Sequence, residues 1–177
     1  MNPSFNDPRS RQPRACGISI VEILLVATII AILTSMGGLI YAGLRERAEL
    51  GQCMSRMKRL HQFAEVHVSE HQTWPYPDHV TPDNEEAWGR AWQQLTEPYD
   101  LLPEDLVCPT HQRTMGDPDL NRHPRIDYLA TPFSGGRWAP YRWARQPWFI
   151  EVGDFHGNGN LVIFPDGHIE SLRDIAR

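Results

Sequence analysis

The chain has 177 residues, of which 41% are hydrophobic and 22% are charged, as in an ordinary folded domain with an appendage. Its formal net charge is −5, and the basic segment 1–17 leaves the remainder still more acidic, so we expect no nucleic-acid partner. No nucleophile elbow, phosphate-binding loop or metalloprotease helix occurs in the sequence. We therefore expect a protein that is not an enzyme, with no catalytic residue and no cofactor.

A run without charged side chains extends over residues 23–44. As a helix it would be roughly 33 Å long, which matches a bilayer core of about 30 Å. Arginines precede this run and favour a cytoplasmic N-terminus. The sequence thus predicts that residues 18–44 cross the inner (cytoplasmic) membrane once, with the C-terminal domain in the periplasm.

Glu22 is an acid close to the start of this apolar run. A charge inside a membrane segment costs about 2.5–3.5 kcal/mol or more, so Glu22 should have a partner. An ordinary secretory signal does not account for it, and a lipoprotein signal would place its cysteine after the run, whereas Cys16 precedes it. The alternative is an interfacial glutamate that reaches the lipid headgroups.

Gly17, Glu22 and the apolar run together resemble the type IV prepilin family, which includes the pseudopilins of type II secretion. The resemblance implies that a prepilin peptidase removes the leader 1–17 by cutting between Gly17 and Ile18. It also implies N-methylation of Ile18 and an ion pair between the new amino group and Glu22, within one subunit or between neighbours. Buried charges are tolerated when they are paired in this way.

Residues 45–72 are expected to continue the same helix as an amphipathic outer half that ends before Pro75. Apolar side chains recur there at intervals of three and four residues, as in a helix with one buried face. They are Leu50, Cys53, Met54, Met57, Leu60, Ala64 and Val68. This stripe should pack on a sheet.

The remainder, 73–177, is expected to be a globular α+β domain with a small antiparallel sheet. A second helix over 81–95 would begin with Thr81 as its cap and Pro82 in its first turn. Short strands are expected within 127–133 and 139–152. The six tryptophans either build the core or are partly exposed to bind glycans, peptides or other subunits.

Residues 159–172 predict a terminal hairpin that turns at Asp166 and Gly167, both with positive φ. His156 lies nine residues before this Asp-Gly pair. The spacing resembles the C-terminal element of a large family of bacterial pilin-like proteins, and extends the first resemblance to about residues 153–172. On the simpler interpretation, His156 and Asp166 brace the hairpin by hydrogen bonds.

Cys53 and Cys108 would remain after leader removal and form a possible disulfide. Such a bond would contribute roughly 4 kcal/mol by constraining the unfolded chain, and the alternative is two buried free thiols. The histidines include no short metal-binding pair, and the acidic segment 117–121 is a weak calcium candidate, so we expect no metal. These histidines are His111, His123, His156 and His168.

The resemblance implies a pilin-like subunit, a processed protein that assembles into a type IV pilus-like or type II secretion filament. Its expected partners are copies of itself, other pseudopilins, prepilin peptidase and the inner membrane. The alternative is a membrane-tethered module that binds carbohydrate or peptide and does not polymerise. A minor or DNA-uptake pilin at a filament tip is a third interpretation, which the acidic chain disfavours.

Overall fold

The computed structural model describes residues 19–116 and 118–176, apart from the side chains of residues 36–40 and 42. The predicted cleavage residues Gly17 and Ile18 lie outside this part of the chain, and so does Asp117 of the calcium candidate. Within this part of the chain, the residues up to Ala42 and those from Gly43 onward form two compact units.

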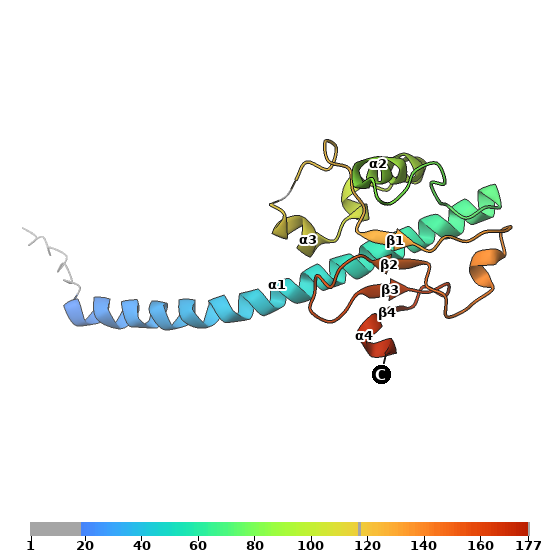
Figure 1. The fold of residues 1–177 in the computed structure, drawn as a ribbon. Helices are drawn as coiled ribbons and strands as arrows, with labels where there is room; N and C mark the ends of the chain where they lie inside the picture. Colours follow the sequence, from blue (N-terminus) through green and yellow to red (C-terminus); the bar gives the residue numbers. More distant parts are fainter. Residues whose placement is uncertain (1–18, 117, 177) are drawn as a thin grey trace, which may run out of the picture. The chain divides into compact units, whose positions relative to one another are not determined.

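Helix α1 (Ile20–His71) is 52 residues long and belongs to both units (Figure 1). One continuous helix was predicted from this sequence, and it is confirmed. Gln72 follows the helix with a φ of 62°, and its backbone N–H donates to the Val68 carbonyl at 3.0 Å. A left-handed residue after the last turn is a common way to end a helix.

The predicted membrane segment over residues 18–44 is wrong, because no helix in the described part of the chain is long and apolar enough to cross a membrane. The single-pass location in an inner membrane is corrected with it.

The unit from Gly43 onward contains a four-stranded antiparallel sheet in the order β1-β2-β3-β4. This confirms the predicted α+β class with a small antiparallel sheet. The strands are β1 (Tyr128–Ala130), β2 (Phe149–Glu151), β3 (Leu161–Ile163) and β4 (Ile169–Ser171). In this register Ala130 lies opposite Phe149, Phe149 opposite Ile163, and Ile163 opposite Ile169, so one row of apolar side chains crosses the sheet.

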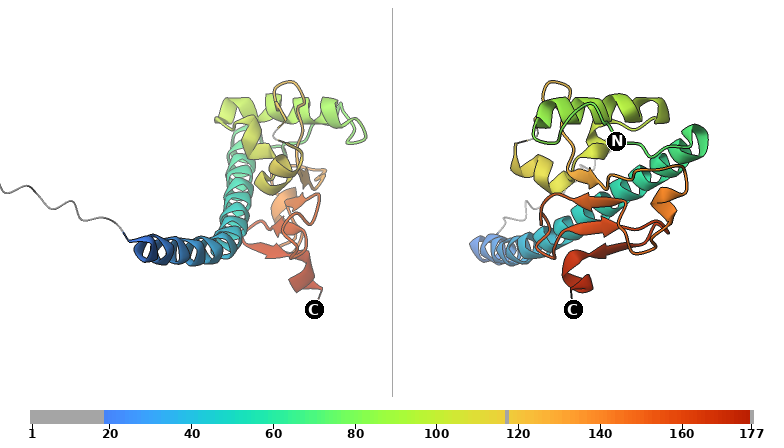
Figure 2. Two further views of the ribbon diagram at one scale, coloured as in Figure 1. Left: turned by 90° about the vertical axis from the view of Figure 1, so that its left-hand side faces the viewer. Right: turned by 45° about the vertical axis from the view of Figure 1, so that its right-hand side comes forward.

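The outer half of α1 lies along one face of the sheet (Figures 1 and 2). The predicted apolar stripe is the face that it buries, although Leu50 and Met54 are only partly buried. The fully or almost fully buried members are Cys53, Met57, Leu60, Ala64 and Val68. The expectation that this stripe packs on a sheet is confirmed.

Tryptophan side chains divide between core and surface. Trp74, Trp88, Trp92 and Trp148 belong to the core cluster, whereas Trp138 and Trp143 are exposed at 68% and 61%. The expected core role is therefore confirmed for four tryptophans, and a binding role of the two exposed ones stays a prediction.

Helix α2 (Glu85–Thr96) starts later than predicted, because Asn84 caps it in place of Thr81. The Asn84 side chain accepts a hydrogen bond from the Ala87 backbone N–H at 3.1 Å. The other short helices are α3 (Pro109–Thr114), α4 (Leu172–Ile175), and the 3₁₀ turns η1 (Glu97–Tyr99), η2 (Pro103–Leu106) and η3 (Ala139–Tyr141).

The segment 139–152 contains the expected short strand, but β2 occupies only its end, Phe149–Glu151. Its first part is the turn η3, in which Pro140 occupies one of the first two positions. Proline has no N–H for a strand ladder, which favours the turn.

The terminal hairpin of β3 and β4 is confirmed, but its turn differs from the predicted one. Gly167 has a φ of 77°, whereas Asp166 is not in the left-handed region. Gly167 N–H donates to the Phe164 carbonyl, and Phe164 N–H donates to the His168 carbonyl, each at 2.9 Å. These bonds define a loop of three residues that needs positive φ at its glycine alone.

Candidate functional site: an exposed apolar helix segment and a buried thiol cluster

Glu22 lies in the first turn of α1, and its side chain is exposed. An acid at this position interacts favourably with the positive end of the helix dipole. Ile18, whose amino group the resemblance pairs with Glu22, lies outside the described chain. The predicted ion pair of Glu22 with the Ile18 amino group therefore stays a prediction.

Large aliphatic side chains are exposed on every side of α1 between Ile20 and Leu33. Isolated apolar side chains are normal on a protein surface, but a contiguous patch of this kind marks a contact surface. The exposed fraction of each is between 49% and 76%, for Ile20, Val21, Ile23, Leu24, Leu25, Val26, Ile29, Ile30, Ile32 and Leu33. We call this set the exposed apolar segment.

Hydroxyl groups within the exposed apolar segment are satisfied by the helix itself. Thr34 Oγ1 donates to the Ile30 carbonyl at 2.9 Å, and Ser35 Oγ donates to the Ile32 carbonyl at 2.8 Å. Thr28 Oγ1 likewise donates to the Leu24 carbonyl. The hydroxyls therefore need no further partner, and a neighbouring helix can pack on this surface without leaving them unpaired.

The second feature is a buried group of four side chains in the unit from Gly43 onward: Cys53, Cys108, Glu151 and His156. One potential ligand atom from each lies within 4.8 Å of those from the other three. Cys53 Sγ is 3.2 Å from Glu151 Oε1, Cys108 Sγ is 3.4 Å from His156 Nε2, and His156 Nε2 is 3.6 Å from Glu151 Oε1. We call these four residues the thiol cluster.

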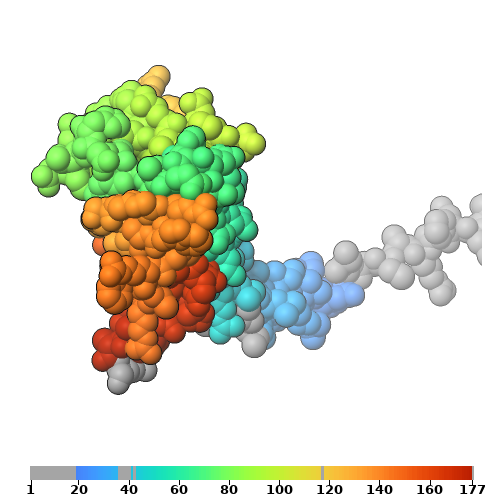
Figure 3. Space-filling model, turned by 90° about the vertical axis from the view of Figure 1, so that its right-hand side faces the viewer, coloured from blue at the N-terminus to red at the C-terminus, as the bar shows by residue number. Residues whose placement is uncertain are grey.

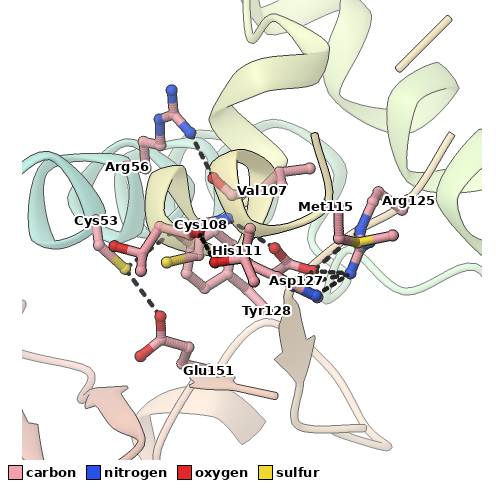
Figure 4. Close-up of polar contacts among 12 residues, drawn as sticks. Cys53, Arg56, Val107, Cys108, His111, Met115, Arg125, Asp127, Tyr128 and Glu151 are labelled. Atoms are coloured by element: carbon pink, nitrogen blue, oxygen red, sulfur yellow. Dashed lines mark hydrogen bonds and ion pairs between the residues drawn. The ribbon is translucent and has the colours of Figure 1, made fainter. Parts of the chain in front are cut away.

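Four separate segments bring the thiol cluster together. Cys53 comes from the buried stripe of α1, Cys108 immediately precedes α3, Glu151 ends β2, and His156 follows in the next loop. Figure 4 shows Cys53 and Cys108 beside the carboxylate of Glu151. The Cys108 backbone N–H donates to Asp127 Oδ2 at 2.8 Å, which fixes the start of α3 against the residue before β1.

Glu151 and both cysteines of the thiol cluster are fully buried, and the His156 side chain is only 5% exposed. Contact with Cys108, burial and the Glu151 carboxylate raise the pKa of the Cys53 thiol well above its usual range. Burial, followed by the Cys53 thiol, also raises the pKa of Tyr128, whose hydroxyl lies 3.2 Å from Cys53 Sγ. The thiol of Cys53 is thus protonated and donates to Glu151.

Two neighbouring carboxylates have a different environment, because arginines pair with both. Asp127 accepts from Arg125 at 2.6 Å and lies 3.1 Å from His111 (Figure 4). Glu49 accepts from Arg113 and Arg45, each at 2.9 Å. Each of these charges is compensated within the protein, as buried charges generally are.

Thr110 connects the Glu49 group to the thiol cluster. Its hydroxyl donates to Glu49 Oε2 at 2.9 Å and lies 3.4 Å from His156 Nδ1. Because the single hydroxyl proton is used for Glu49, the Thr110 oxygen can only accept from Nδ1–H. This arrangement leaves the His156 Nε2 lone pair directed at Cys108 and Glu151.

The structure brings together some of the residues predicted as sites and separates others. Cys53 and Cys108 are close together, and both are free and buried; their disulfide stays a prediction. His156 lies in the thiol cluster, while Asp166 accepts from the His168 N–H within the hairpin turn. The turn is held to α1 by a different histidine, since His61 Nε2 lies 3.0 Å from the Pro165 carbonyl.

Glu151 was missed in the sequence, although a signal for it exists. In a strand, alternate residues face the same side, so Glu151 shares a face with Phe149. An acid on the apolar face of a strand needs a specific partner in the core, so its position in the alternating pattern indicates a buried polar site.

A further surface feature contains the two exposed tryptophans. Trp138 and Trp143 line a hollow of about 830 Å³ together with Phe133, Tyr141 and Gln146. The guanidinium of Arg137 lies 4.3 Å from the centre of the Trp138 ring. Figure 3 shows the segment around residue 140, in orange, at the molecular surface.

Comparisons of the chain with protein-family models, with curated proteins and with solved structures found no match.

Proposed function

We propose that this chain is a pilin-like subunit whose exposed apolar segment packs against the same segment of other subunits in a filament. The observation that carries this proposal is the exposure of large aliphatic side chains all around α1 between Ile20 and Leu33. A helix that is apolar on every side needs partners on every side. A bundle of equivalent helices from neighbouring subunits provides them.

Glu22 supports an ordered bundle over a nonspecific aggregate. An acid enclosed in an apolar bundle requires a cationic partner at a fixed position, which sets the register between helices. Cleavage after Gly17 would create such a partner in the amino group of Ile18. Prepilin peptidase, as the resemblance implies, is the enzyme that we propose for this cleavage.

The first test determines the mass and the N-terminal sequence of the protein isolated from the cells that make it. We expect an N-terminal, methylated Ile18. A protein that retains residues 1–17 would have no amino group to pair with Glu22, and the proposed assembly would be refuted.

The second test compares assembly of two matched variants by electron microscopy and sedimentation. Val26 and Val66 lie on the same helix and are exposed at 49% and 45%, but only Val26 belongs to the exposed apolar segment. We expect Val26→Asp to abolish filaments and Val66→Asp to leave them unchanged. Glu22→Val should abolish ordered filaments too, and normal filaments from either Val26→Asp or Glu22→Val would contradict the proposal.

The exposed tryptophans favour a second candidate function, the binding of carbohydrate. An exposed indole ring offers a flat apolar surface with one polar N–H, which suits the apolar face of a sugar ring. The hollow beside Trp138 and Trp143 also provides the hydrogen-bonding side chain of Gln146. Isothermal titration with soluble oligosaccharides should detect binding that Trp138→Ala and Trp143→Ala each weaken at least tenfold. If no oligosaccharide binds, or if both variants bind as the unchanged protein does, this function is excluded.

A further inference from the structure

The spacing of the thiol cluster matches a tetrahedral metal site. Zinc binds sulfur at about 2.3 Å and nitrogen or oxygen at about 2.0–2.2 Å, so ligand atoms at the corners of a tetrahedron are roughly 3.3–3.8 Å apart. Three separations in the cluster are 3.2, 3.4 and 3.6 Å, and every separation is within 4.8 Å. The four ligand atoms thus surround one position to which small side-chain adjustments would bring them all.

The carboxylate of the thiol cluster also lacks a directly bound cation. Glu151 is fully buried, and among the described residues the only basic side chain within 4 Å of its carboxylate is His156, which presents a lone pair on Nε2 at 3.6 Å. Asp127 and Glu49, by contrast, each have an arginine at hydrogen-bond distance. A divalent cation bound to Oε1 would give Glu151 a direct positive partner, as the arginines give to the other two carboxylates. The net charge of the site would stay at −1, because two thiol protons leave as two positive charges enter.

Outer contacts already orient two of the potential ligands. Thr110 accepts from His156 Nδ1, which directs the Nε2 lone pair toward the cluster. The Leu161 backbone N–H donates to Glu151 Oε2 at 3.3 Å, so Oε1 is left facing Cys53 and His156. Such hydrogen bonds to the far side of each ligand are typical of protein metal sites.

We propose that Cys53, Cys108, Glu151 and His156 bind one zinc ion. Two sulfurs and an imidazole select a borderline-soft transition metal over calcium or magnesium. Both thiols lose their protons to solvent on binding, so the two thiolates and the carboxylate become the anionic ligands. Four protein ligands leave no open position for substrate, so the ion is structural and joins α1, the start of α3, β2 and the loop that follows it.

An approach to this site exists on the surface. His156 lines a hollow of about 550 Å³ together with Glu46, Glu49 and Thr110. Two arginines, Arg47 and Arg113, also line the hollow and balance the charge of its two acids. His156 is the member of the thiol cluster at its wall, so an ion that enters the hollow meets His156 first.

The experiment measures zinc in full-length protein purified without chelators or metal-affinity resin. We expect one zinc per chain after gel filtration, loss of zinc on treatment with a strong chelator, and a lower melting temperature of the stripped protein. Replacement by cobalt should produce the intense near-ultraviolet absorption of cobalt–thiolate bonds and the visible bands of a tetrahedral ion. Cobalt spectra without thiolate absorption, or stripped protein that fails to regain zinc, would overturn the assignment.

Matched variants separate a specific site from surface binding. Cys108→Ser and Glu151→Gln should each lower the zinc affinity at least tenfold, whereas His168→Gln should retain one zinc per chain. His168 is a suitable control because its side chain is 58% exposed and also lies 3.0 Å from a glutamate, Glu170. Circular dichroism identifies any variant that fails to fold, and in that case the cobalt spectrum of the unchanged protein decides.

The same preparation tests the competing disulfide, because one pair of sulfurs cannot form both structures. Intact mass measured after alkylation without reductant distinguishes them. The zinc site is supported if Cys53 and Cys108 are both alkylated after zinc removal but not before it. A mass that shows Cys53 bonded to Cys108, or zinc below one-tenth of an equivalent, would refute it.

Discussion

The two halves of α1 are both rich in large apolar side chains, but among the described side chains only those of the outer half are buried within this chain. Leu60 is fully buried, whereas Ile30 is exposed at 55%. The outer half places its apolar residues in one stripe, and a single sheet covers that stripe. The first half is apolar on all sides, and no single layer of structure can cover a helix of this kind.

The comparison teaches that the arrangement of apolar residues, more than their number, determines where a helix finds its partner. A single apolar stripe can be covered by other elements of the same chain, whereas a helix that is apolar on all sides needs several neighbours to cover it. On this basis, side-chain truncation should affect the stability of the isolated subunit in the outer half and affect only assembly in the first half.

The largest expected effect is that of Leu60→Ala. Removal of a fully buried leucine side chain costs about 2–5 kcal/mol, because both apolar transfer and packing contacts are lost. The matched change Ile30→Ala should alter the free energy of unfolding by no more than about 0.5 kcal/mol, as is usual for exposed positions. Urea unfolding of the unassembled protein measures both. Equal effects of the two changes would mean that the halves do not differ as described.

The next effect concerns Glu49, the acid at the start of the outer half. Hydrogen bonds from Arg113, supported by Thr110 and Arg45, lower the pKa of Glu49 from its usual 4.5 to about 2, against the opposing effect of burial. A carboxyl whose pKa is lower in the folded protein stabilises the fold fully above its unfolded pKa. This contribution should disappear as the pH falls from about 4.5 to about 2.

Glu49→Gln should therefore flatten the acid limb of a plot of melting temperature against pH, and it should do so between those two values. The control is Glu86→Gln, which removes an exposed ion pair of 2.7 Å with Arg90. Exposed pairs contribute about 0–1 kcal/mol, so this control should leave the acid limb almost unchanged. Identical acid limbs for Glu49→Gln and the unchanged protein would show that the Arg113 pair does not link stability to pH.

Local patterns in the sequence were sufficient to predict several elements. The spacing of Cys53, Met57, Leu60 and Ala64 identified the buried face of α1, since helical periodicity reports directly which side is covered. The pair Asp166–Gly167 located the terminal hairpin for a similar reason, because turn chemistry lies within a few residues. The first half of α1 was correctly predicted to be helical, but its predicted membrane crossing is contradicted.

The thiol cluster, in contrast, depends on tertiary contacts that no local pattern encodes. Cys53 and Glu151 are separated by 98 positions in the sequence, and their meeting requires the register of α1 on β2. The difference between buried and exposed tryptophans also depends on tertiary contacts. Trp143 and Trp148 occur in the same proline-containing segment, but only Trp148 directly precedes strand β2 and is buried. Periodicity cannot report such differences where the segments are this short.

The smallest expected effect, from Gly51→Ala, concerns the backbone of the outer half of α1. Gly51 is exposed, and a Cβ atom added there has no neighbour within 4 Å, so alanine fits without strain. Alanine is favoured over glycine inside a helix by about 1 kcal/mol, and the melting temperature should rise by a few degrees. Gly89→Ala is the contrasting change in α2, where the added Cβ would lie 2.3 Å from the Pro124 carbonyl oxygen and should destabilise the fold. A lower melting temperature for Gly51→Ala would contradict the prediction, because it would require a close neighbour at Gly51 where the structure has none.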